Sequence, residues 1–323
     1  MKNLIFILIL LQLTSAHAEN AMDIWHQRFS GRVNVVRPIL AMQNVKQAGA
    51  PPTAECLRRY DRFYSGNTLE ITMALGYYDN RPFNGVQDGP QQMELERMLM
   101  TGCGPNQYAC GFRKVPAPAN AFSNSFIKVI KGPDNRPREI HIKIFHASET
   151  INDDVNRLSD AQVIRSRLAE DAFKSALRNS DIIFYMGHSR DGGGPDFDPP
   201  RLLGNNHVDY PWYHQNRGDF RELLAEIDAA SRPPKLLGLL SCLSNMHFAA
   251  AIRRTSPTTG LMVSLNEIGD GQMFEGIMTF LNGIQRFKCE AQLSSDLDAV
   301  NIDKTKVHNQ QKSLLEFRVF PPK

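Results

Sequence analysis

The sequence lacks the features that mark zinc-binding, nucleic-acid-binding and membrane-spanning proteins. It has five cysteines in 323 residues and no Cys-x-x-Cys pair, so the common zinc-site pattern is excluded. The formal net charge is +3, too small to indicate a nucleic-acid partner or an anionic membrane. One long apolar run occurs near the N-terminus, and no second run of that length follows. We therefore expect a globular protein with no nucleic-acid partner and no membrane anchor.

The first 18 residues have the pattern of a signal peptide. Lys2 precedes the apolar run 4–13, and Ala16-His-Ala18 is a small-x-small cleavage site. The apolar run is too short to span a bilayer. We expect residues 1–18 to be removed and the chain from Glu19 onward to be exported, either to the periplasm or out of the cell.

Two short apolar runs end at residues that can carry catalysis. The run 181–187 stops at His188, and the run 235–241 stops at Cys242. Apolar runs of this length, bounded by turn or cap signals, are typical of strands buried on both faces of a parallel sheet. Because the carboxyl ends of such strands line the ligand crevice, we expect both side chains at one edge of the sheet.

The segments around these two strands predict an α/β domain. Helical spacing of apolar residues and β-type runs favour helices and strands in alternation. The residues after His188 are rich in glycine and proline and should form a loop at the rim. Helices are expected at 160–179, 217–230, 245–254 and 273–287, and further strands at 126–131, 139–146 and 259–265. This order predicts a three-layer fold with a mostly parallel central sheet over residues 126–323.

The N-terminal region, residues 19–125, is poorly defined by its sequence. Helical patterning occurs at 54–63 and 91–100, and the Pro/Ala segment 116–121 is the best candidate for a linker. We expect an accessory domain, a propeptide or a segment wrapped on the sheet.

These features together resemble the caspase-like, or clan CD, cysteine peptidases, which include clostripain, the gingipains and legumain. The resemblance covers roughly residues 139–288. It rests on a strand ending in Gly187-His188, a glycine-rich loop after it, and a strand ending in Ser241-Cys242. Caspase-type peptidases place the catalytic His about 50 residues before the Cys, and here the separation is 54. The resemblance implies a caspase-like three-layer sandwich that hydrolyses a protein or peptide substrate without a cofactor.

Specific roles follow from this resemblance. His188 would act as general base and acid, Cys242 as nucleophile, and the backbone N–H groups of Ser189 and Cys242 as oxyanion donors. Ser189 stands where the family usually has glycine, and it retains the N–H. Basic-selective members that resemble clostripain carry an acidic side chain just after the strand that follows the Cys, where this chain has Glu267 and Asp270. We expect cleavage after Arg or Lys, with Asp270 favoured because glycines flank it.

The odd number of cysteines predicts at least one thiol outside disulfides in an exported monomer. Cys103 and Cys110 are close enough in sequence to form a local bridge, which would leave Cys56 and Cys289 to pair. Cys242 would then keep its thiol. Three pairings of the other four cysteines remain possible from the sequence.

Other interpretations use other residues. The sequence around Ser189 nearly spells the Gly-x-Ser-x-Gly elbow of an α/β-hydrolase-type serine esterase, although glycines rather than a helix follow it. Cys56 and His141 could form a papain-like pair. A non-catalytic caspase-like binding scaffold is the non-enzyme alternative. The oxygen-rich loop residues Asp191, Asp196 and Asp198, together with His207 and His214, could bind calcium.

Overall fold

The computed structural model describes residues 54–59, 66–78, 88–104, 107–118, 121–132, 134–150, 152–300 and 317–320. The expected signal peptide, residues 1–18, lies outside the described residues. In the described part of the chain, no helix combines the length and the apolar character needed to cross a membrane.

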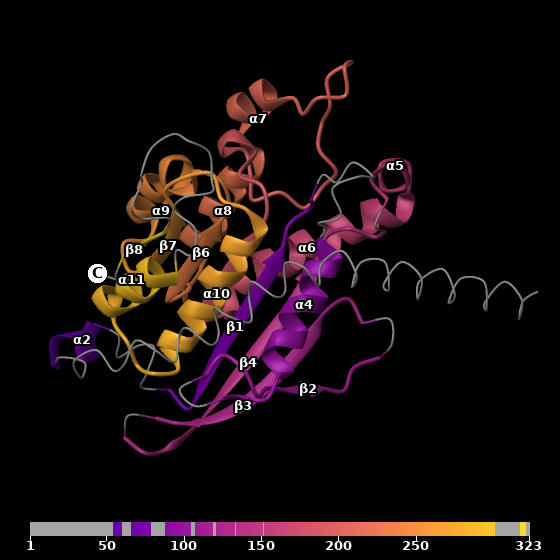
Figure 1. Ribbon diagram of the computed structural model, residues 1–323. Coiled ribbons are helices and arrows are strands. Elements are labelled where there is room, and N and C mark those ends of the chain that lie inside the picture. Colours follow the sequence, from indigo (N-terminus) through magenta and orange to yellow (C-terminus); the bar gives the residue numbers. More distant parts are fainter. Residues whose placement is uncertain are drawn as a thin grey trace, which may run out of the picture.

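An eight-stranded mixed sheet forms the centre of the described part (Figure 1). Its strand order is β2-β3-β4-β1-β5-β6-β7-β8. The five strands β4, β1, β5, β6 and β7 are parallel, whereas β2, β3 and β8 join through antiparallel pairs. The strands are β1 Thr68–Leu75, β2 Arg113–Val115, β3 Asn124–Lys131, β4 Pro137–His146, β5 Ile182–Met186, β6 Leu236–Leu240, β7 Gly260–Ser264 and β8 Phe317–Phe320.

Helices cover both faces of this sheet (Figure 1). Buried residues of α4, α10 and α11 pack against one face, and those of α6, α8 and α9 pack against the other. The fold is therefore α/β with a mostly parallel sheet, compatible with a three-layer sandwich. The helices are α2 Ala54–Arg59, α4 Asp88–Met100, α5 Asp153–Asn156, α6 Asp160–Asn179, α7 Tyr210–Asn216, α8 Gly218–Ala229, α9 Ala250–Thr255, α10 Asp270–Ile284 and α11 Glu290–Val300, with a 3₁₀ turn η1 Arg190–Gly192 and a π-helical turn η2 Asn245–Ala249.

Burial on both faces explains the continuous apolar sequence of the central strands. In β5, Phe184 and Met186 belong to the core beside α4 and α10, whereas Ile183 and Tyr185 belong to the core beside α6 and α8. Successive side chains of a strand point to opposite faces, so both kinds of position must be apolar when both faces are covered. The strands expected before His188 and Cys242, and the hairpin β3–β4, are confirmed.

β1 comes from the N-terminal region of the sequence but lies in the middle of the sheet. It pairs in parallel with β4 on one side and with β5 on the other. β1 therefore belongs to the same sheet as the strands from β3 to β8. The five parallel strands lie in the order β4-β1-β5-β6-β7, which is 2-1-3-4-5 when they are counted along the chain. From β1, the chain adds β4 on one side and then β5, β6 and β7 on the other, so the strand order reverses between β1 and β5. In doubly wound sheets this reversal point is where ligands bind.

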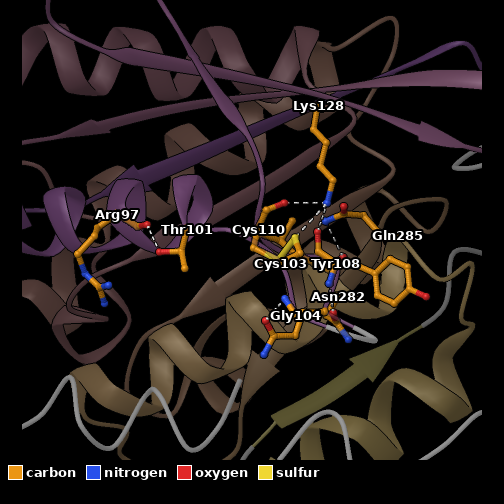
Figure 2. Close-up of a disulfide and its surroundings, with 11 residues drawn as sticks. Arg97, Thr101, Cys103, Gly104, Tyr108, Cys110, Lys128, Asn282 and Gln285 are labelled. Carbon is orange, nitrogen blue, oxygen red and sulfur yellow. Dashed lines mark hydrogen bonds between the residues drawn. A yellow bond between two sulfur atoms is a disulfide. The ribbon is translucent and has the colours of Figure 1, made fainter. Parts of the chain in front are cut away.

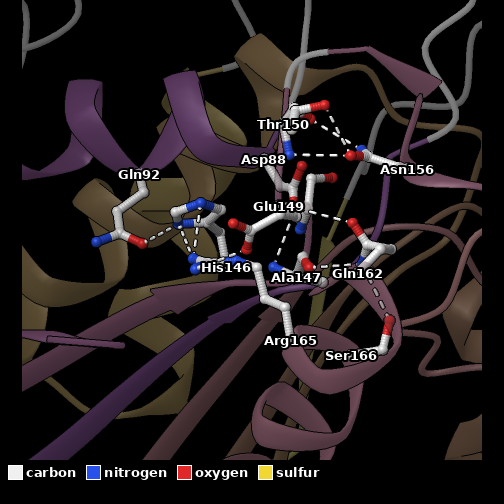
Figure 3. Close-up of polar contacts among 11 residues, drawn as sticks. Asp88, Gln92, His146, Ala147, Glu149, Thr150, Asn156, Gln162, Arg165 and Ser166 are labelled. Atoms are coloured by element: carbon white, nitrogen blue, oxygen red, sulfur yellow. Dashed lines mark hydrogen bonds and ion pairs between the residues drawn. The ribbon is translucent and has the colours of Figure 1, made fainter. Parts of the chain in front are cut away.

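The first turns of α6 differ from the simple apolar stripe that the sequence suggests. Ile164 and Leu168 are exposed, although α6 has the expected bounds. Gln162 is buried in their place. Its side chain donates to the carbonyl of Ala147 at 2.9 Å and accepts from the N–H of Glu149 at 2.7 Å (Figure 3). A polar side chain faces the sheet edge here because it satisfies backbone groups of the turn after β4.

A disulfide closes the connection between α4 and β2 (Figure 2). Cys103 and Cys110 are bonded, as the sequence predicted. The Lys128 ammonium of β3 donates to the carbonyls of Tyr108 at 2.5 Å and Cys110 at 2.7 Å, and the N–H of Tyr108 donates to Asn282 of α10 at 2.8 Å. Burial lowers the pKa of Lys128 to about 8. The loop is thus tied to both the sheet and α10.

Cys289 and Cys242 have the bonded and thiol forms that the sequence predicted. Cys289 takes part in a disulfide. The side chain of Cys56, its expected partner, lies outside the described part of the structure. Cys242 is outside any disulfide.

Candidate functional site

His188 and Cys242 occupy equivalent positions at the carboxyl ends of two neighbouring strands. Met186 of β5 is in register with Leu240 of β6. His188 lies two residues after Met186, and Cys242 lies two residues after Leu240. The N–H of Gly187 still donates to the Leu240 carbonyl at 3.3 Å, so the two strands stay paired one residue further. Adjacent strands are about 4.8 Å apart. The register therefore brings His188 and Cys242 to the same level of one sheet edge.

His188 lies at the reversal point of the sheet. Its ring packs on Tyr78, which follows β1, with ring centroids 4.9 Å apart. The hydroxyl of Tyr78 contacts the sulfur of Met273 in α10 at 3.5 Å. These contacts place the His188 side chain on the face of the sheet that α10 covers. Tyr78 carries no motif, and only the pairing of β1 with β5 brings it beside His188.

The thiol of Cys242 lies on the same face. Its Sγ donates to the carbonyl of Ile268 at 3.7 Å, just before α10 begins. The side chain is half-buried. His188 borders α10 through Tyr78 and Met273, and Cys242 borders it through Ile268, so both candidate residues line the region where α10 starts.

The turn after Cys242 is locked to the end of β7. Ser244 Oγ donates to the carbonyl of Leu239 at 2.6 Å and accepts from the N–H of Ser264 at 2.8 Å. The N–H of Leu243 donates to the carbonyl of Asn266 at 2.9 Å. Leu243 itself has a left-handed backbone conformation, with φ 54°. A non-glycine residue in this conformation requires support from its surroundings, and these bonds supply it. Cys242 therefore sits on a fixed backbone.

The backbone of His188 is held by a buried phenol. Tyr185 Oη donates to the His188 carbonyl at 3.0 Å and accepts from the N–H of Asp196 at 2.9 Å. Burial raises the pKa of Tyr185 well above its usual value. A Cβ on Gly76 or on Gly187 would lie 2.5 Å from this hydroxyl, so both positions require glycine. The sequence carries no signal for this role of Tyr185, because its place in an apolar run indicates a core side chain.

The loop after His188 closes on a buried ion pair. Arg190 Nε contacts Asp196 Oδ2 at 2.6 Å, and Arg190 is 1% exposed. Burial raises the pKa of Asp196, and the Arg190 charge opposes that rise. Ser189 is also buried, and one 3₁₀ turn rather than a helix follows it. An α/β-hydrolase elbow needs a helix directly after its serine, so this geometry disfavours the esterase interpretation.

The two acids expected to bind substrate flank the carbonyl that contacts the thiol. Glu267 precedes Ile268 and is exposed. Asp270 is the first residue of α10, which begins three residues before the helix that the sequence predicted at 273–287; its side chain lies outside the described part. Both acids are thus within two residues of Ile268, the contact of Cys242 Sγ.

Three residues of the calcium interpretation, Asp191, Asp196 and His214, contact charged or titratable side chains. Asp196 pairs with Arg190, and Asp191 contacts His214 at 3.2 Å and His247 at 3.8 Å. Within the described ranges, no three His, Cys, Asp or Glu side chains form a group that could hold a metal ion.

The papain-like alternative has one described partner. His141 lies in the middle of β4, where its ring contacts Glu70 at 2.8 Å and Glu139 at 3.0 Å. A histidine that is already paired with two carboxylates on the sheet surface is poorly placed to activate a thiol.

No model of a known protein family matches the chain, and no curated protein matches it.

Proposed function

We propose that this chain is an exported caspase-like cysteine endopeptidase, in which His188 and Cys242 form the catalytic dyad. The observation that carries the proposal is the equivalent register of the two residues at the carboxyl ends of β5 and β6. Nucleophilic thiol catalysis requires a thiol and a base beside it. A cysteine and a histidine supply these groups here, on one face of neighbouring strand ends and next to the reversal point of the sheet.

The chemistry assigns one task to each group. His188 takes the proton of the Cys242 thiol, and the thiolate attacks the carbonyl carbon of the scissile peptide bond. The N–H groups of Ser189 and Cys242 stabilise the oxyanion. His188 then gives its proton to the leaving amine, so the C–N bond breaks and a thioester remains. Water, deprotonated by His188, hydrolyses the thioester and restores the thiol.

Specificity for Arg or Lys before the scissile bond is the second part of the proposal. Glu267 and Asp270 stand within two residues of Ile268 in the sequence, and the carbonyl of Ile268 contacts the Cys242 thiol. A carboxylate can pair with a guanidinium through two parallel hydrogen bonds. We expect Asp270→Asn to reduce cleavage after Arg relative to cleavage after an apolar residue. An unchanged ratio in both Asp270→Asn and Glu267→Gln would reject this assignment.

The dyad is tested with an arginine-containing peptide chloromethyl ketone, followed by mass-spectrometric mapping of the labelled residue. We expect Cys242 to be labelled in the wild type and the label to be lost in His188→Ala. Cys242→Ala and His188→Ala should each abolish peptide hydrolysis, and the double variant should be no worse, because residues that act as a unit are not additive. Ser189→Ala separates the dyad from a serine nucleophile, because it removes the hydroxyl and keeps the N–H that the dyad mechanism uses.

Two outcomes favour the other candidates. Activity that survives Cys242→Ala but disappears in Ser189→Ala indicates a serine esterase. A Cys242 thiol that reacts no faster than an ordinary thiol, in a chain that nonetheless binds peptides, indicates a binding scaffold.

A further inference from the structure

Arg217 connects the two segments that carry the proposed catalytic residues. Its Nε donates to the carbonyl of Gly192 at 2.9 Å, and its Nη2 donates to the carbonyl of His247 at 2.8 Å. Gly192 lies four residues after His188, and His247 lies five residues after Cys242. One guanidinium thus joins the loop after β5 to the π-helical turn after β6.

The guanidinium is held in this position by its surroundings. Its Cζ lies 4.8 Å from the ring centroid of Phe220, and Phe220 packs on Phe248 with centroids 4.9 Å apart. Gly192 has φ 89°, and a Cβ there would lie 3.1 Å from Arg217 Nη2. Glycine is therefore needed for both the turn and the close approach. Arg217 itself joins α7 to α8 in the left-handed region, at φ 46°.

Arginine suits this junction better than lysine does. The planar guanidinium presents several N–H donors in a fixed geometry, so one side chain can reach two carbonyls at once. The lysine ammonium is a compact group and lacks this fixed arrangement of donors.

We propose that Arg217 is a positioning residue that holds His188 and Cys242 at their working separation. This inference rests on the proposed function. Arg217 acts through the backbones of two segments, so its loss should misplace the imidazole and the thiol relative to each other. A misplacement of about 1 Å can reduce a rate about 10²-fold. The expected effect is therefore on kcat, with KM for a peptide substrate changed little.

The test compares Arg217→Lys and Arg217→Ala with Arg221→Lys, a matched change at an exposed position of α8. The first measurement is the rate of alkylation of Cys242 by iodoacetamide as a function of pH. We expect the wild type to react through a thiolate that forms below the usual pKa of about 8.5. Both Arg217 variants should shift the profile toward that value, whereas Arg221→Lys should leave it unchanged.

The second measurement is rescue. Free guanidinium at millimolar concentration should restore part of the alkylation profile and of kcat in Arg217→Ala, which a variant that has lost its fold cannot show. An unchanged profile and kcat in both Arg217 variants would overturn the inference, as would a loss in Arg217→Ala that guanidinium does not relieve.

The two proposals fail differently. If the wild-type profile is that of an ordinary thiol and His188→Ala does not alter it, the dyad itself is rejected, and the positioning role falls with it. If the profile depends on His188 but not on Arg217, the dyad stands and only the role of Arg217 is rejected.

Discussion

Asp88 is a fully buried acid whose protonation should couple the stability of this protein to pH. It begins α4, and its Oδ2 accepts the N–H groups of Ala147 at 2.8 Å and Ser148 at 2.6 Å (Figure 3). Its Oδ1 is buried and has no hydrogen bond. Burial raises the pKa of Asp88 to about 6, from an ordinary value of 3.8, although the two N–H groups favour the charged form.

The size and sign of the effect follow from this difference. The pKa rise is roughly two units, and each unit corresponds to 1.36 kcal/mol, so the contribution is about 3 kcal/mol. The folded state holds the proton more tightly than the unfolded state. Stability from Asp88 is therefore fully present below pH 3.8 and is lost as the pH rises through about 6.

Asp88→Asn removes this titration and keeps a side-chain oxygen that can accept the two N–H groups. The free energy of unfolding of the variant, relative to wild type, should rise by up to about 3 kcal/mol between pH 4 and pH 7. Urea unfolding followed by circular dichroism at several pH values measures the difference. Asp154→Asn, which removes an exposed acid of α5, is the control for the loss of one carboxyl group. A pH-independent difference for Asp88→Asn would refute the reasoning.

Three other perturbations test other parts of the fold. Replacing Cys103 and Cys110 by alanine removes a short covalent loop, and the free energy of unfolding should fall by about 2–3 kcal/mol in non-reducing urea titrations, with no effect of reductant on the variant. Asp196→Asn leaves the buried Arg190 charge without its carboxylate, so we expect a loss of about 3–5 kcal/mol by the same measurement; a loss below 1 kcal/mol would show that the pair is solvated. Burial holds the pKa of His146 at about 3, so the protein should lose stability as the pH falls from 6.5 toward 3, and His146→Gln should lose less.

Local sequence signals were sufficient for the elements that carry the candidate site. The helix expected at 160–179 is α6, and the apolar runs before His188 and Cys242 are β5 and β6. A strand that is buried on both faces needs apolar residues at successive positions, so its sequence alone marks its length and its end.

Some elements and contacts lacked such a signal. β8 pairs antiparallel with β7 from more than 50 residues further along the chain, and α7 lies between the loop expected after His188 and the helix expected at 217–230, where the sequence predicted no element. Arg190 and Asp196 stand in a glycine-rich loop, where charged residues usually indicate solvent exposure. They are buried because the loop folds back over the sheet edge and encloses them as a pair.

By itself, the sequence determined most of the strands and helices around the candidate site, that His188 and Cys242 stand at strand ends, and that Cys103 and Cys110 lie close enough to bond. Periodicity, turn residues and short spacings are local properties, so each acts within its own segment of the chain. Only the tertiary structure decided that β1 enters between β4 and β5, that Tyr78 packs on His188, and that the Arg217 guanidinium bridges two loops. Those contacts depend on the order in which distant strands pair, and strand order is set by the burial of whole faces rather than by any single segment.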